Sequence, residues 1–266
     1  MDKKDFEKYE FYYTNDLPII YGEIQIHPIK VKDYFFFQQM ISCISLEKDK
    51  VPDVKILSMS YLEYLMHLIN KKITEEDKIV SEYLEYSFYQ FLNLAIGVDQ
   101  VRVKYDKNGK IFLSVLLRDN IEKKKWIDIS RKEFDDIKDI VLFQNIPDYD
   151  NKYVNPDVQE EIDAVRAIEN KNIEMPSLEM RKITLSLNSN YTLDSINGLT
   201  LRKFNLMLDQ SDSILNYKIY KQAELGGMVT FKEKIGHYLY KNKKNKLGGA
   251  LLDYGSFKDK MSKVAK

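Results

Sequence analysis

The stretch LTLRKFNLMLDQSDSILNYKIYKQAELGGMVTFK, from Leu199 to Lys232, carries the longest regular pattern in the chain. Its apolar residues recur with the 3.6-residue period of an α-helix, at Leu201, Phe204, Leu208, Leu215 and Ile219. Thr200 precedes the pattern and predicts an N-cap, because its hydroxyl can accept a hydrogen bond from the first turn. Gly226 and Gly227 follow it and predict the helix end. We therefore expect a helix over 201–225 to be the scaffold of the C-terminal region.

The composition bounds the class of protein. The chain has 266 residues, of which 44% are hydrophobic, so one large or two small domains with a sizeable core can form. Lys and Arg number 41 and so do Asp and Glu, which gives a net charge of zero and argues against a generally basic surface for nucleic acid. The single cysteine, Cys43, lies in an apolar run and predicts a buried side chain in a reducing environment, not a disulfide. No stretch approaches the roughly 20 apolar residues of a membrane helix.

Strand patterns lie only in the N-terminal half. Alternating apolar residues on both sides of Asp106-Lys107-Asn108-Gly109 predict a β-hairpin over 101–116, with Asn-Gly in a type I′ turn. Trp126–Ile129 predicts a third strand. A short strand is expected around Ile24 and Ile26, ended by Pro28.

Helix signals surround these strands. Ser60, Thr74 and Ser130 each precede a helical pattern and have an acidic residue two or three positions later, which predicts capped helix starts. The segment from Val31 to Leu46 is apolar on most sides and predicts a core helix. Its three consecutive rings, Phe35 to Phe37, also allow the alternative that one ring is exposed as a contact.

Residues 145–155 carry turn formers and little periodicity, and we place a boundary there. The predicted division is an α+β region over 1–148 and a helical region over 155–266, with further helices after Pro156, Pro176 and Thr192 and near 234–240. The predicted fold class is α+β and predominantly helical, with a small antiparallel sheet in the N-terminal region.

Motifs that carry chemistry are missing from this sequence. It contains no phosphate-binding loop, dinucleotide fingerprint, nucleophile elbow or HExxH. One cysteine and three scattered histidines, His27, His67 and His237, do not have zinc-ligand spacing, and His67 is expected to pack in the core. Asp148, Asp150 and Asp157 lack the spacing of a calcium loop. We therefore predict a protein that is not an enzyme, with no catalytic residue, no cofactor and no metal.

Three stretches carry a resemblance to a known family. IYGEIQIHPIKVKDYFFF, VPDVKILSMSYLEYL and INGLTLRKFNLMLDQSDSILNYKIYKQAELGGMVTFK resemble tail-module proteins, of tail assembly or baseplate hub, from tailed phages and prophages of low-GC Gram-positive bacteria. The matching elements are Thr200 to Phe204, which read T-L-R-K-F, and Gly227 to Lys232, which read G-M-V-T-F-K. His27 stands where the family pattern has an aromatic residue, and Gly226 where a hydroxyl residue is common.

The resemblance implies a non-enzymatic, structural protein of tail or baseplate assembly that binds other tail proteins, such as the tape-measure or hub proteins. It implies a location in the bacterial host cytoplasm during assembly, with the virion tail as the alternative final location. It implies no membrane, nucleic-acid or small-molecule partner.

Two sets of apolar residues and one basic run are the candidate contact residues, Phe35, Phe36, Phe37, Leu206, Met207, Lys241, Lys243, Lys244 and Lys246. The basic run also supports an alternative function, a nucleic-acid-binding accessory protein that uses 241–246 to meet phosphates.

Overall fold

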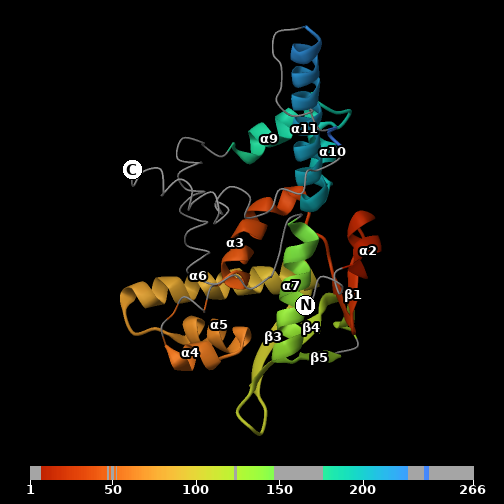
Figure 1. Ribbon diagram of the computed structural model, residues 1–266. Helices are drawn as coiled ribbons and strands as arrows, with labels where there is room; N and C mark the ends of the chain where they lie inside the picture. The colour runs from red at the N-terminus through yellow and green to blue at the C-terminus, as the bar shows by residue number, and fades with distance from the viewer. Residues whose placement is uncertain are drawn as a thin grey trace, which may run out of the picture. The chain divides into compact units, whose positions relative to one another are not determined.

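The computed structural model describes residues 7–46, 48, 51, 53–122, 125–146, 176–226 and 237–239 (Figure 1). The chain divides into two compact units, one of Met1–Asn151 with Asn190–Leu206, and one of Lys152–Ser189 with Met207–Lys266. The fold is α+β and predominantly helical with small antiparallel sheets, as predicted. Within the described ranges, no helix combines the length and apolarity needed to cross a membrane.

The first unit opens with a short helix, α2 (Glu10–Thr14), and a tight hairpin of β1 (Ile19–Tyr21) and β2 (Ile24–Ile26). The two strands are antiparallel, with Ile19 opposite Ile26. The prediction of one strand here was incomplete, because Gly22 adopts a φ of +58° and lets the chain reverse between the two strands.

Four helices follow, of which three begin with a side-chain cap. They are α3 (Tyr34–Ile44), preceded by the 3₁₀ turn η1 (Val31–Asp33), then α4 (Val54–Ser58), α5 (Tyr61–Asn70) and α6 (Glu75–Phe91). The predicted caps at Ser60 and Thr74 are confirmed, and both form complete capping boxes. A π-helical turn, η3 (Leu92–Ile96), continues α6 and ends at Gly97, whose φ is +73°.

The larger sheet has the order β3-β4-β5, with β3 (Val98–Tyr105), β4 (Ile111–Leu117) and β5 (Trp126–Ile129) all antiparallel. The 3₁₀ turn η4 (Arg118–Asn120) lies between β4 and β5. The predicted hairpin and third strand are confirmed.

The type I′ turn predicted for the β3–β4 hairpin was wrong. Gly109 has a φ of +73°, but Asn108 does not have a positive φ. The Asp106 carboxylate accepts hydrogen bonds from the backbone N–H groups of Asn108 and Lys110, both at 2.7 Å, and the Gly109 N–H donates to the Asp106 carbonyl. These bonds favour a type I turn followed by a glycine bulge.

The core of the first unit centres on α7 (Arg131–Asn145), which begins at the predicted capping box of Ser130. Phe134 of α7 is fully buried, and its ring lies 5.8 Å from that of Phe91, 6.2 Å from that of Phe88 and 6.5 Å from that of Tyr61. These aromatic contacts join α5, α6 and α7 into one hydrophobic core.

Residues from far along the chain complete this unit. The short helix α10 (Leu193–Asn197) is the one predicted after Thr192, whose side chain caps it, and the long helix α11 (Leu201–Leu225) follows it. The Val31 N–H donates to the Leu199 carbonyl at 2.9 Å, and the Leu201 N–H donates to the Ile29 carbonyl at 2.8 Å. The predicted division placed all of 155–266 in one helical region, whereas these bonds hold residues 190–206 in the first unit.

The second unit contains α9 (Leu178–Leu187), capped by Ser177, and the rest of α11. Only the first turn of α11 has buried apolar residues, Leu201 and Phe204, whereas Leu215 and Ile219 of the same stripe are about half exposed. The predicted helix after Pro156, most of the one near 234–240 and the run 241–246 lie outside the described residues.

Candidate functional site

The aromatic helix α3 buries only part of its apolar surface. Phe37, Met40, Cys43 and Ile44 form its buried face. Phe35 and Phe36 point away from this face and are 65% and 44% exposed. The prediction of a core helix therefore holds for one side of α3, and the alternative of exposed rings holds for the other.

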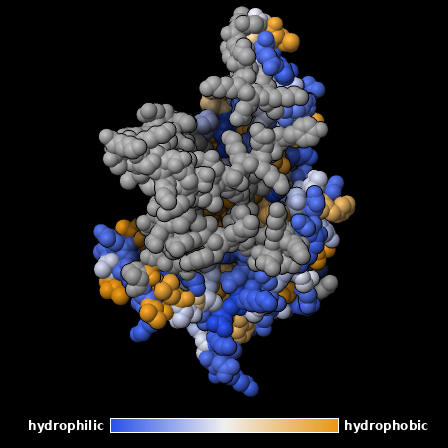
Figure 2. Space-filling view, viewed as in Figure 1, coloured by the Kyte–Doolittle hydropathy of each residue, from blue (hydrophilic) through white to orange (hydrophobic). Residues whose placement is uncertain are grey.

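Helix α6 carries a second exposed apolar face. Leu84, Phe88 and Phe91 are buried on one side, whereas Ile79, Val80, Tyr83 and Tyr86 are each at least 45% exposed. Figure 2 shows hydrophobic side chains gathered where α4 and the N-terminal part of α6 lie. The exposed aliphatic residues Val54 and Leu57 belong to α4.

Small hydroxyl residues fix α6 against its two neighbours. The Ser42 hydroxyl of α3 donates to that of Ser87 at 3.2 Å, and the Ser81 hydroxyl donates to the Ile69 carbonyl of α5. Both serines of α6 are fully buried. Since these contacts account for two sides of α6, its remaining side faces solvent. We define the α3–α6 surface as Phe35, Phe36, Ile79, Val80, Tyr83 and Tyr86.

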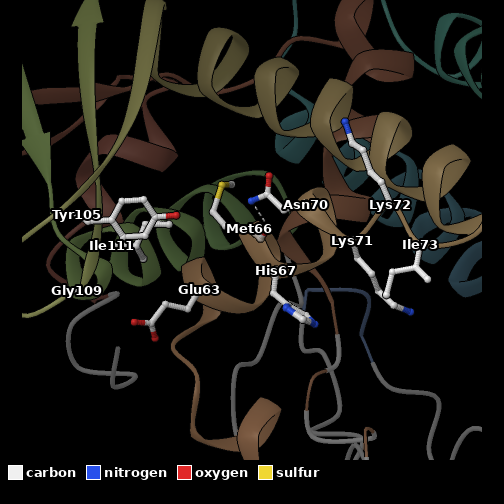
Figure 3. Close-up of a pocket in the computed structure, with 10 residues that line it drawn as sticks. All are labelled: Glu63, Met66, His67, Asn70, Lys71, Lys72, Ile73, Tyr105, Gly109 and Ile111. Carbon is white, nitrogen blue, oxygen red and sulfur yellow. Dashed lines mark hydrogen bonds between the residues drawn. The ribbon is translucent and has the colours of Figure 1, made fainter.

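An open depression of about 460 Å³ lies between the C-terminal half of α5 and the tip of the β3–β4 hairpin (Figure 3). Glu63, His67, Lys71, Lys72 and Tyr105 provide its polar groups. His67 is exposed, so the prediction that it packs in the core was wrong. It lies at the edge of the apolar face of α5 and lines this depression.

The polar groups of this depression are engaged in structural interactions. Burial alone would raise the pKa of Glu63, but hydrogen bonds from the backbone and side chain of Ser60 and the ion pair with Arg131, 2.7 Å away, outweigh it and lower the pKa. Lys71 pairs with Asp77 at 2.9 Å. Among the described ranges no three His, Cys, Asp or Glu side chains are placed to hold a metal ion.

Two other ionisable groups, one buried and one half-buried, also have altered pKa values. Cys43 is fully buried, as predicted, and burial raises the pKa of its thiol, so it is not an activated nucleophile. Burial also raises the pKa of Asp135, against the opposing effect of nearby Lys138. Neither group lines the depression.

The T-L-R-K-F motif, which carries the family resemblance, holds the start of α11 in the first unit. We call these residues, Thr200 to Phe204, the clasp. The Thr200 hydroxyl accepts from the Lys203 N–H, as predicted for the cap, and donates to the Asp16 carboxylate at 2.8 Å. Arg202 donates to the Phe143 carbonyl at 2.8 Å and lies over the ring of Tyr13, 4.3 Å from its centroid. Leu201 and Phe204 fill the core.

Sequence reasoning missed the residues that receive this clasp. Asp16, which has a φ of +58°, also pairs with Lys203 at 3.1 Å. Asn145 is buried, and its side-chain oxygen accepts from the Ile29 N–H at 2.9 Å. Neither residue stands in a recognisable local pattern.

The other predicted contact residues are placed in part. Leu206 and Met207 follow the clasp on α11, where Leu206 is exposed and Met207 half-buried. The lysines at 241, 243, 244 and 246 are outside the described residues. The structure therefore groups the exposed Phe residues with the α6 face, which sequence reasoning had not singled out.

Comparisons with known proteins identify no relative. No protein-family model, no curated protein and no solved structure matches the chain.

Proposed function

We propose that this protein is a non-enzymatic component of phage tail assembly or of the baseplate hub, and that it acts by binding other tail proteins through the α3–α6 surface. The proposal takes its biological setting from the sequence resemblance. The observation that carries its mode of action is the exposure of six large apolar residues on two adjacent helices of one unit. Exposed large apolar residues are typical of protein interaction sites.

The resemblance motif supports the scaffold more than the site. The clasp residues hold the start of α11 in the first unit, and Ile24, Ile26 and Ile29 of IYGEIQIHPI are buried. These residues therefore indicate a scaffold related to that of the tail-module family. The partner-binding role therefore depends on the α3–α6 surface.

Quantitative mass spectrometry of purified particles and of the producing lysate tests the biological setting. A small fixed copy number relative to the tail proteins would indicate a resident baseplate or hub subunit. Presence with tail proteins in the lysate but absence from particles would indicate an assembly factor. If no phage protein accompanies the chain in either sample, the proposal is wrong.

The surface can be tested in the same samples. We expect Phe35→Asp with Tyr83→Asp to abolish co-purification with tail proteins. Phe11→Asp is the matched control, because Phe11 is 66% exposed on a different helix, α2. Equal recovery of tail proteins with the double variant and the control would exclude the α3–α6 surface as the contact.

A further inference from the structure

The exposed apolar residues of α6 have the spacing of a helix-recognition stripe. Ile79, Tyr83 and Tyr86 occupy positions i, i+4 and i+7, so they lie one above the other along one face. All three are close to half exposed or more. Such a face matches the anchor spacing by which an amphipathic helix binds an apolar partner surface.

Carboxylates lie on both sides of this stripe. Glu82 follows Ile79 by three residues and precedes Tyr86 by four, which places it along one edge. Glu76 precedes Ile79 by three residues and Val80 by four, which places it along the other. Both are exposed, and within the described ranges neither forms an ion pair.

The remaining charges of α6 strengthen the acidic character. Glu75 pairs with Lys78 at 2.5 Å, and Asp77 pairs with Lys71. Glu85 adds a further acid. Lys78 is therefore the only basic residue of α6, and it is already neutralised.

We propose that the α6 stripe binds a basic amphipathic helix of a partner protein. The apolar face of that helix would cover Ile79, Tyr83 and Tyr86, and its flanking Lys or Arg residues would face Glu76 and Glu82. Opposite charges on both rims orient the partner and suppress acidic competitors. This inference rests on the proposed function and specifies the chemistry of the partner.

A synthetic 14-residue amphipathic helix of Leu and Lys, labelled with a fluorophore, is the probe. Its binding to the full chain is followed by fluorescence anisotropy, with a Leu and Glu helix of the same pattern as the charge control. We expect the basic helix to bind and the acidic helix not to bind. Tyr83→Asp should weaken binding by at least about tenfold, as expected for a central aromatic anchor.

Two variants show whether the site is the stripe. Phe11→Asp introduces the same charge in place of an exposed ring on a different helix, α2, and should leave the affinity within about twofold. Ile79→Ser removes an anchor without adding charge and should also weaken binding. Circular dichroism melts of all variants establish that each one folds.

A charge exchange tests the rims. The double variant Glu76→Lys with Glu82→Lys should lose the basic helix and gain the acidic one, because the apolar stripe is unchanged while both rims are inverted. If the double variant behaves like the unaltered chain toward both probes, the assignment of the rims is wrong.

Two other outcomes would overturn the proposal, each for a different reason. Equal loss of binding with Tyr83→Asp and Phe11→Asp would mean non-specific attraction to an acidic protein. Sedimentation showing self-association that Tyr83→Asp abolishes would make a second copy the occupant. Since the peptide assay needs no phage component, its failure leaves the particle measurements intact, and failure of those leaves peptide binding intact.

Discussion

Two helices that begin in the first unit, α6 and α11, have similar caps, but their first turns lie in opposite environments. Thr74 caps α6 and Thr200 caps α11, each through a hydrogen bond to the third residue that follows. Beyond the cap, the first turn of α11 is buried and its side chains find partners from distant parts of the chain. The first turns of α6 instead expose Ile79 and Val80.

The difference separates what the fold needs from what it leaves available. Removing a side chain from the α11 clasp removes packing or a buried hydrogen bond, so it should cost stability. Removing a side chain from the α6 stripe removes few contacts within the folded chain, so it should change stability little. Stability and partner binding should therefore respond to different residues.

The largest expected effect is that of Phe204→Ala. Phe204 is 1% exposed, so the change should lower the free energy of unfolding by about 3–5 kcal/mol. Urea unfolding followed by circular dichroism measures this loss. Leu225→Ala on the same helix is the control: Leu225 is 85% exposed and should change stability by less than about 0.5 kcal/mol. Similar losses for both would contradict the contrast within α11.

The next effect concerns Asn145→Ala. This change leaves the buried Ile29 N–H without its acceptor and should lower the free energy of unfolding by about 1–3 kcal/mol. Asn188→Ala is the matched control, since its exposed side chain bonds only the carbonyl one turn earlier in its own helix. A hydrogen bond of this kind contributes ~1 kcal/mol to stability. A difference between the two variants of less than about 0.5 kcal/mol would therefore show that water replaces the acceptor.

A smaller effect depends on pH at the capping box of α5. The pKa of Glu63 is lowered in the folded chain, so its contribution to stability is present above the unfolded value of about 4.3 and is lost as pH falls through the folded value. We expect Glu63→Gln to lower stability by about 0.5–1 kcal/mol at neutral pH, an effect that shrinks as pH falls below the unfolded value.

Urea unfolding at several pH values measures the dependence on Glu63. Arg131→Gln should reproduce the loss at neutral pH, and the double variant should lose less than the sum, because the two side chains share one ion pair. A loss from Glu63→Gln that is constant from neutral to acidic pH would rule out the ion pair as its cause.

The smallest effect on stability is expected at the α6 stripe. Ile79→Ser and Tyr83→Ser should each change the free energy of unfolding by less than about 0.5 kcal/mol, because both side chains are largely exposed. The same variants should produce the largest losses of peptide binding. A loss of several kcal/mol would mean that the stripe is part of the core, and the comparison would fail.

Local signals in the sequence predicted the elements well. Caps at Ser60, Thr74, Ser130 and Thr200 depend on residues within one turn, so the sequence alone predicts them. The turn at Asn108-Gly109 was wrong in detail, because the Asp106 side chain selects a different conformation from a pair that also suits type I′.

Contacts between residues far apart in the chain could not be predicted from the sequence. The Asp16–Thr200 bond joins residues 184 positions apart, and the Ile29–Asn145 bond joins residues 116 apart. His67 was misplaced because a position at the edge of a helical stripe is buried or exposed according to what packs there.

The bonds between residues 29–31 and 199–201 also set the order in which the chain can fold. The β1–β2 hairpin, α3 and the larger sheet are all synthesised before residue 199 leaves the ribosome. Until then, Asp16 and the backbone of Val31 have no access to the α11 partners they bind in the finished fold. Closing so long a loop is entropically costly and slow compared with local contacts. The first unit is therefore completed late in synthesis, by residues 190–206.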